Sequence, residues 1–181
     1  MVFDLDYTLW DLWIDTHISP PLKRHADDIN HLTDSLDFYP EVPGILKELK
    51  ERRIHIAIAS RTGEGDLARE ALSLLLVPDI DGKIVRSSSY FQTMEIYPSS
   101  KLKHFKAIHK KTGIPYEEML FFDDEHRNFE VESLGVTMQF ITDGTGRKAF
   151  NEGLALWRKR RGIKIVSKDS LAESRQEHHH D

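Results

Sequence analysis

The sequence predicts an α/β fold with a central, mostly parallel sheet between layers of helices. Apolar runs of strand length, at residues 54–59, 119–122 and 136–141, alternate with segments whose apolar residues recur at helical spacing. Polar residues follow the ends of these runs, and open parallel sheets bind ligands at the carboxyl ends of their strands. The two observations together predict one ligand site at that edge of the sheet.

The first strand is predicted at the apolar start of the chain, and it leads directly into Asp4 and Asp6. Because side chains alternate along a strand, these carboxylates share one side while Leu5 points into apolar packing. Two close carboxylates suit phosphoryl transfer, since one can attack phosphorus while the other protonates the leaving alcohol. The alternative is that one of them caps a helix or closes a turn. A buried strand usually begins earlier, so we expect the native chain to extend before Met1.

Composition predicts one soluble domain, over residues 1–160, with a small insertion at about 10–38 and a disordered tail at 161–181. The net charge of -5 argues against nucleic-acid binding, and the absence of cysteine excludes disulfides and a cysteinyl-phosphate mechanism. No apolar run approaches the length of a membrane span, and no secretory leader is recognisable. We therefore expect a cytoplasmic monomer without membrane or nucleic-acid partners.

The insertion is predicted to border the site without covering it. Alternating apolar residues from Trp10 to Ile14 suggest a short strand or hairpin arm, and the polar residues 25–37 a loop. Trp10 and Trp13 could stack on a substrate. Packing is the commoner role of large aromatic side chains, and it is the role expected for both.

A second polar cluster follows the strand predicted at residues 54–59, which comes after a helix starting near Glu41. Ser60 offers a hydroxyl at the end of this strand, and the loop behind it offers backbone N–H groups to an oxyanion. An equally strong alternative makes Thr62 the cap of the next helix. Arg61 could clamp a phosphate or face solvent.

A third candidate is Lys101, which opens a predicted helix with an apolar face, after a strand predicted within residues 90–98. A lysine is unfavourable at the positive end of a helix dipole, so a bound phosphate would explain it. The alternative is a solvated lysine.

The fourth cluster comes after the strand predicted at residues 119–122. Asp123, Asp124 and Glu125 lie at its end, and Asn128 follows at the start of a helix. Acidic oxygen ligands without histidine or cysteine favour Mg²⁺. The loop at residues 143–146 carries only a Gly-x-Gly, which is too weak to predict a nucleotide site.

The chain resembles the phosphatases of the haloacid dehalogenase superfamily, and among them the magnesium-dependent phosphatase family. The matching stretches cover most of residues 2–142 in the expected order: VFDLDYTLW at 2–10, YPEVP at 39–43, ASRT at 59–62, EIYPSSK at 95–101, HF at 104–105, KTGIP at 111–115 and FFDDEHRN at 121–128. The resemblance implies a three-layer, Rossmann-like fold without a substantial cap domain. Residues 79–94 look longer and more polar than the family's connection.

The resemblance also implies roles for the clustered residues. Asp4 would be the nucleophile and Asp6 the general acid and base. Lys101 would steady the nucleophile and the phosphoryl group, which Leu5, Ser60 and Arg61 would also bind. Mg²⁺ would be held by Asp4, by the backbone carbonyl of Asp6 and by one further acid. Asp124 is favoured as that acid, because Asn128 then falls at the family's second polar position. Asp123 would support the metal ligands without binding the metal directly.

The activity implied is phosphomonoester hydrolysis through an aspartyl phosphate, on phosphotyrosine, phosphoproteins or phosphorylated sugar adducts. Two other functions use similar residues. A receiver-like signalling domain also gathers aspartates, a hydroxyl residue and a lysine around Mg²⁺, but its acceptor aspartate follows a middle strand, where this chain has Ser60. A non-catalytic scaffold of the same fold would more often have lost Asp4 or Asp6, and both are present.

Overall fold

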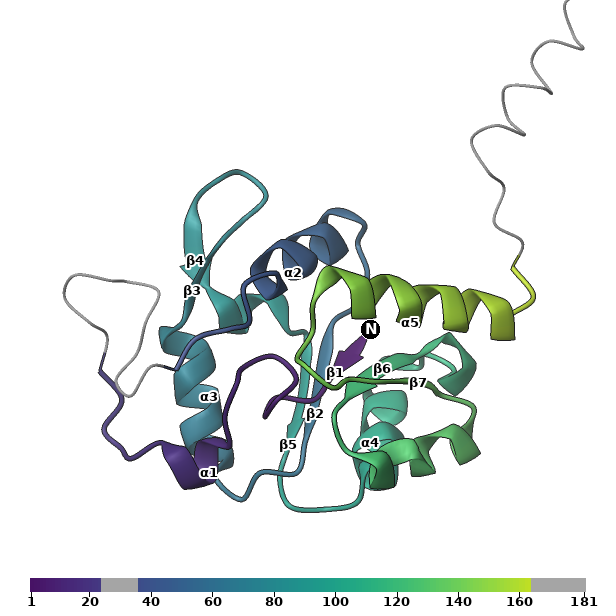
Figure 1. Ribbon diagram of the computed structural model, residues 1–181, viewed down its shortest axis with the longest axis horizontal. Helices are drawn as coiled ribbons and strands as arrows, with labels where there is room; N and C mark the ends of the chain where they lie inside the picture. Colours follow the sequence, from purple (N-terminus) through teal and green to yellow (C-terminus); the bar gives the residue numbers. More distant parts are fainter. Residues whose placement is uncertain (24–35, 164–181) are drawn as a thin grey trace, which may run out of the picture.

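The computed structural model describes residues 1–23 and 36–163, and its centre is a sheet of five parallel strands (Figure 1). The strand order is β5-β2-β1-β6-β7, so the first strand of the chain lies in the middle. The strands are β1 (Val2–Phe3), β2 (Ala57–Ser60), β5 (Thr93–Ile96), β6 (Leu120–Asp123) and β7 (Thr137–Phe140). The predicted α/β fold with a parallel sheet is confirmed.

Helices cover both faces of the sheet, because its strands are apolar on both sides. One apolar cluster joins Phe3, Ile58 and Phe122 to three helices, which are α2 (Val42–Glu51), α3 (Gly65–Leu74) and α5 (Arg147–Arg160). A second cluster joins the alternate strand residues, such as Val2 and Phe121, to α4 (Lys101–Thr112) and to the 3₁₀ segment η4 (His126–Leu134). The result is the expected three-layer arrangement. No helix within the described residues is long and apolar enough to cross a bilayer.

Strand register brings the polar clusters to one edge. In the parallel ladder, Phe3 lies opposite Ile58 on one side and Phe122 on the other. The residues that follow these three positions therefore emerge side by side, and the N–H of Asp4 donates to the carbonyl of Phe122 over 3.0 Å. Asp4 and Asp123 follow these positions directly, and β2 continues for two residues to Ser60, so all three lie at the carboxyl edge of the central strands.

The insertion differs from its prediction. Residues Ile14–His17 form a single helical turn, α1, where a strand or hairpin arm was expected. The N–H groups of Thr16 and His17 both donate to the carbonyl of Trp13, so the backbone bonds locally and makes no ladder. Trp10 is fully buried, as expected, but Trp13 is 50% exposed and packs on Tyr7 and His17 outside the core. Most of the predicted loop at 25–37 lies outside the described residues.

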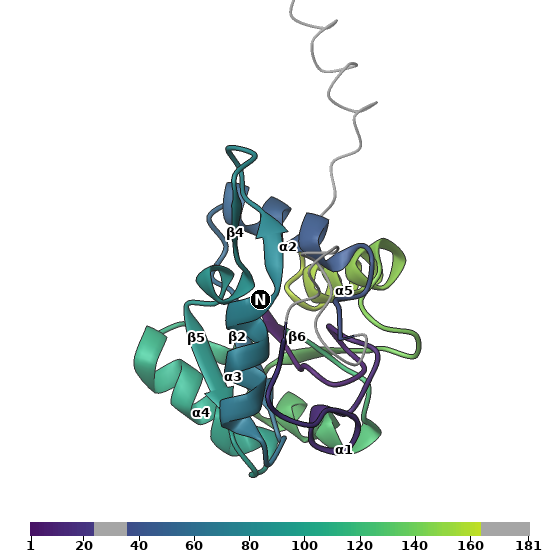
Figure 2. The same cartoon turned by 90° about the vertical axis from the view of Figure 1, so that its left-hand side faces the viewer.

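The long connection before Lys101 contains a two-stranded antiparallel hairpin, β3 (Leu76–Pro78) and β4 (Ile84–Arg86). It projects at the end of the molecule opposite α1 (Figures 1 and 2). A 3₁₀ turn, η2 (Ser87–Tyr90), follows, and it shortens the strand that was predicted to start near residue 90. A further 3₁₀ turn, η3 (Tyr116–Glu118), precedes β6.

Gly144 illustrates a backbone position that the fold reserves for glycine. Its φ is +75°, and a Cβ there would lie 2.3 Å from the ring of Tyr39. Gly82, in the hairpin turn, has a similar φ of +80° but open space around it. Substitution at Gly82 therefore tests only the free-energy cost of a left-handed backbone. Substitution at Gly144 adds the cost of a steric clash with Tyr39.

We expect Gly82→Ala to lower the free energy of unfolding by about 1–2 kcal/mol, because only the left-handed conformation is penalised. Gly144→Ala should cost about 1–3 kcal/mol more, because the Tyr39 ring must also move. Urea denaturation of both variants measures the difference. Equal losses would show that the ring yields freely and that the close approach is unimportant.

Candidate active site

A cavity of about 330 Å³ opens at the carboxyl edge of the sheet. It gathers most of the predicted site residues from four separate parts of the chain. Its lining consists of Asp4, Asp6, Trp13, Asp15, Thr16, Ser60, Arg61, Thr62, Lys101, Asp124, Glu125, Arg127 and Asn128. Asp123 lies directly behind this lining and is fully buried. The side chain of Leu5 is buried in the core, so only its backbone can face the cavity.

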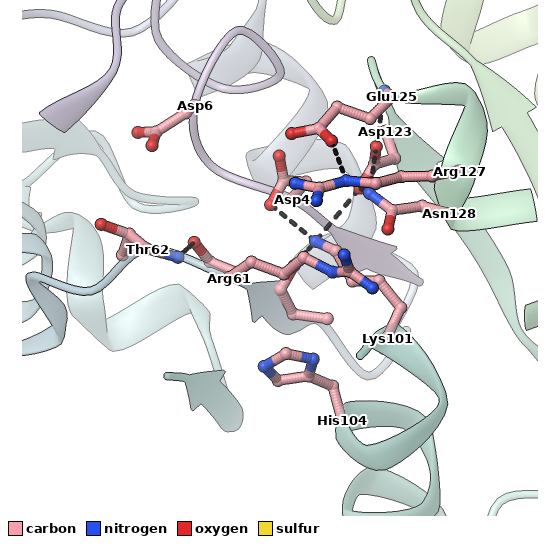
Figure 3. A network of polar contacts seen from close by, with 12 residues as sticks. Asp4, Asp6, Arg61, Thr62, Lys101, His104, Asp123, Glu125, Arg127 and Asn128 are labelled. Carbon is pink, nitrogen blue, oxygen red and sulfur yellow. Dashed lines mark hydrogen bonds and ion pairs between the residues drawn. The ribbon is translucent and has the colours of Figure 1, made fainter. Parts of the chain in front are cut away.

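Lys101 forms the centre of the polar network (Figure 3). Its ammonium lies 2.7 Å from Asp4 Oδ1 and 3.1 Å from Asp123 Oδ2, and it also donates to the carbonyl of Ala59. The side chain is only 1% exposed. A lysine at the start of a helix was expected to need an anion nearby, and two carboxylates of the protein itself, Asp4 and Asp123, supply it. The alternative of a solvated lysine is wrong.

Burial and neighbouring charges shift the pKa values of this cluster. Burial alone would lower the pKa of Lys101, but Asp4 and Asp123 outweigh it, so the pKa is raised and the ammonium stays protonated. Burial raises the pKa of Asp4, helped by Asp123 and opposed by Lys101. Burial also raises the pKa of Asp124 to about 6, again with a contribution from Asp123. Burial and the charge of Asp123 therefore act in the same direction on both acids.

These residues fit a divalent cation. Asp4, Asp123 and Asp124 each offer a carboxylate oxygen, and the three oxygens lie within 4.8 Å of one another. Three carboxylates with one ammonium leave a formal excess of two negative charges, which a divalent ion would neutralise. A set made only of oxygen ligands suits Mg²⁺.

The two neighbouring acids differ in how free their oxygens are. Asn128 Nδ2 donates to both oxygens of Asp123 over 2.9 Å, and the N–H of Glu125 donates to Oδ1 over 2.7 Å. With Lys101 also bound, Asp123 is already fully engaged. Asp124 is partly exposed and lines the cavity, so it is the more accessible of the two for a metal.

Asp6 is held apart from this network. Its Oδ1 accepts from the indole of Trp10 over 2.7 Å and from the N–H of Ile14 over 3.2 Å. Figure 3 shows its carboxylate directed away from Asp4. Both hydrogen bonds use Oδ1, which leaves Oδ2 as the oxygen that can carry a proton. Burial raises the pKa of Asp6 to about 6, although the bonds from Trp10 and Ile14 oppose the shift.

The loop after β2 supplies another part of the cavity wall, with Ser60, Arg61 and Thr62. Ser60 is buried, and its Oγ accepts a weak bond of 3.3 Å from the N–H of Thr62. Thr62 Oγ1 in turn accepts from the N–H of Glu64, which is the cap residue of α3. Thr62 therefore stabilises the turn before the helix and is not itself the cap.

Arg61 is fixed by a residue that the sequence did not reveal. Its Nη2 lies 2.9 Å from Glu130 Oε1, and the same oxygen accepts the N–H of Lys101 over 2.9 Å. One carboxylate oxygen thus ties the loop after β2 to the start of α4. Glu130 lies in η4 among other acidic residues, and no local pattern distinguishes it.

Trp13 also lines the cavity. The sequence favours packing over a substrate contact for this residue, because the sequence does not show that the side chain is exposed.

The parallel sheet and the aspartates clustered at its carboxyl edge fit a phosphatase of the haloacid dehalogenase superfamily. The chain belongs to the acid phosphatase family, whose model matches residues 1–160. The family predicted from the sequence motifs is confirmed.

Named relatives agree with this assignment. A HAD-like hydrolase superfamily protein of Schizosaccharomyces pombe is 48% identical over 141 residues, which cover 76% of this chain and 81% of that protein. Magnesium-dependent phosphatase 1 of Homo sapiens is 42% identical over 161 residues, or 87% of this chain and 86% of that protein.

Solved structures show the same fold at lower identity. The phosphatase-containing N-terminal part of a Bacteroides fragilis protein, solved with magnesium, has a TM-score of 0.59 and 19% identity, and the match covers 86% of this chain and 39% of that one. A HAD family enzyme of Bacteroides thetaiotaomicron, a magnesium complex, has a TM-score of 0.56 and 14% identity, covering 83% and 96% of the two chains.

The buried lysine generates a prediction about stability. Lys101→Met removes the cation shared by Asp4 and Asp123 and leaves both carboxylates buried without it, so we expect a loss of about 3–5 kcal/mol in the free energy of unfolding at neutral pH. The control is Lys83→Met, which removes an ion pair whose side chains are 81% and 52% exposed. It should cost less than about 1 kcal/mol. Chemical denaturation compares the two, and similar losses would contradict a central role for the Lys101 network.

Proposed function

We propose that the chain is a Mg²⁺-dependent phosphomonoester hydrolase that works through an aspartyl phosphate on Asp4. The observation that carries the proposal is the arrangement of three close carboxylate oxygens and one buried lysine, facing Ser60 and Arg61 across a single cavity. A cation beside phosphate-binding groups and a carboxylate nucleophile meets the main needs of phosphoryl transfer.

The metal would be held by Asp4, by Asp124 and by the backbone carbonyl of Asp6, with Asp123 oriented behind them by Asn128 and Lys101. When bound, Mg²⁺ neutralises charge on the phosphoryl oxygens and aligns the displacement. The name of the human relative and the magnesium in the two neighbouring structures support this choice. The engaged oxygens of Asp123 favour Asp124 as the direct ligand.

The reaction needs two displacements at phosphorus. In the first, the Asp4 carboxylate attacks, an Asp4 O–P bond forms, the ester P–O bond breaks, and Asp6 gives its proton to the departing oxygen. In the second, Asp6 takes a proton from water as the water oxygen attacks phosphorus, which releases inorganic phosphate and restores Asp4. Lys101, Ser60, Arg61 and the backbone of Leu5 would hold the phosphoryl oxygens throughout.

The substrate candidates are those that the family resemblance implies. Phosphotyrosine, other protein-borne phosphates and phosphorylated sugar adducts all present a phosphomonoester that can enter a cavity bordered by α1. The catalytic unit would be residues 1–160 of one chain, and we propose that it acts as a cytoplasmic monomer.

We expect Asp4→Asn to abolish turnover of an aryl phosphate, because the amide cannot form the acyl phosphate. Asp6→Asn should slow turnover by roughly 10²–10⁴-fold, the usual contribution of general acid–base catalysis. A phosphorylated form of this variant should accumulate, because the second displacement lacks its base. Steady-state assays and acid-quenched labelling measure these two effects, with Asp81→Asn in the distant hairpin turn as the control.

Removal of the metal should have the same result as removal of Asp4. A chelator is expected to abolish wild-type activity, and added Mg²⁺ to restore it. A receiver-like domain would instead become stably phosphorylated by a small phosphodonor without turnover, and a scaffold would do neither. Turnover by Asp4→Asn at the wild-type rate would exclude the aspartyl-phosphate mechanism.

A further inference from the structure

Trp13 is the one large apolar side chain that is both strongly exposed and part of the cavity, among residues 1–23 and 36–163. Its exposed fraction is 50%. The other exposed large apolar residues of the described chain, which do not line this cavity, are Ile54, Ile80, Ile84 and Ile163. Single exposed apolar residues need no explanation in general. An indole in the wall of a polar phosphate-binding cavity is a more specific feature.

The indole is held in place by two aromatic neighbours. The imidazole of His17 stacks on it at a centroid distance of 5.7 Å and an interplanar angle of 13°. The ring of Tyr7 stands nearly perpendicular to it, at 83° and a centroid distance of 5.2 Å. The N–H of Trp13 donates to Nδ1 of His17 over 3.0 Å, which fixes the same pair from the backbone. The exposed part of the ring is therefore a fixed surface, and little conformational freedom is lost when a ligand contacts it.

The position of this surface relative to Asp6 indicates what it contacts. The N–H of Ile14, the residue after Trp13, donates to the Asp6 carboxylate over 3.2 Å. Asp6 is the group that would protonate the departing oxygen, so the carbon skeleton attached to that oxygen lies on the same side of the cavity as Trp13. The phosphoryl-binding groups Ser60, Arg61 and Lys101 come from other parts of the chain.

We propose that Trp13 is a specificity-determining residue, whose exposed indole surface stacks on the leaving group and selects phosphomonoesters with a flat, unsaturated ring next to the ester. The proposal rests on the hydrolase function proposed above and deepens it. Aromatic stacking contributes beyond simple area burial, whereas a saturated ring of the same size gains only the burial. The stack should therefore favour flat over saturated leaving groups by about two- to tenfold.

The test compares benzyl phosphate with cyclohexylmethyl phosphate, which have the same carbon skeleton and both release a primary alcohol, but of which only the first has a flat ring. We expect the wild type to prefer benzyl phosphate in kcat/KM. Trp13→Leu should remove most of this preference, and Trp13→Phe should keep most of it. Inhibition by inorganic phosphate, which has no leaving group, should be unchanged in both variants. Trp157→Leu is the matched control, because Trp157 lies in α5 and does not line the cavity.

Three results would overturn the proposal. In the first, the wild type has the same kcat/KM for both esters. In the second, Trp13→Leu keeps the wild-type preference for benzyl phosphate. In the third, inhibition of Trp13→Leu by inorganic phosphate weakens by as large a factor as its kcat/KM for the esters falls. The last would show that Trp13 only maintains the shape of the site. Failure of the hydrolase function itself is distinguishable, because the wild type would then hydrolyse neither ester in the presence of Mg²⁺.

Discussion

The buried ammonium of Lys101 is the contact on which the arrangement of the site depends. It reaches Asp4 after β1, the carbonyl of Ala59 in β2 and Asp123 at the end of β6, so one group joins the three central strands to α4. A lysine pays a large desolvation cost at 1% exposure unless opposite charges surround it. Two carboxylates that would otherwise repel become neighbours of one cation, and the whole cluster still retains the excess negative charge that a divalent ion requires.

Around this centre, the other polar residues are oriented by contacts that serve more than one element. Glu130 Oε1 accepts from both Arg61 Nη2 and the N–H of Lys101, so one oxygen connects the loop after β2 to the start of α4. Asn128 holds both oxygens of Asp123. Such shared acceptors make the geometry of the cavity rigid before any substrate arrives, which is the condition for electrostatic stabilisation without reorganisation.

The insertion after β1 has a larger part in the site than its size suggests. Its Trp10 is buried against Phe38 and donates its indole N–H to Asp6, while the first N–H of α1 donates to the same oxygen. Trp13 lies between these two donors, and its indole is exposed in the wall of the cavity. A segment of one helical turn therefore positions Asp6 and presents an aromatic surface beside it, which in the proposed reaction would link the protonation of a leaving group to its recognition.

Parts of the fold that depend on local pattern could be predicted, and parts that depend on distant partners could not. The strands ending at Ser60 and Asp123 are apolar runs bounded by polar residues, and α4 has a clear apolar face; all were predicted in type and approximate position. The turn at residues 14–17 was predicted as a strand because Trp10, Leu12 and Ile14 alternate as strand residues do. The apolar periodicity of a sequence contains no information on these hydrogen bonds. The N–H of Ile14 donates to Asp6, and the carbonyl of Trp13 accepts from two nearby N–H groups.

The sequence by itself determined which residue types stand at the strand ends, because buried apolar runs identify the strands and parallel topology brings their carboxyl ends together. It therefore specified Asp4, Asp6, Ser60, Lys101, Asp123 and Asp124 as one cluster, together with the family. Only the tertiary structure decided how these residues pair: that the protein's own carboxylates supply the anion of Lys101, that Glu130 holds Arg61, and that Trp13 faces the cavity while Trp10 is buried. The physical reason is that charge pairing and burial depend on residues brought close by folding, whatever their separation along the chain.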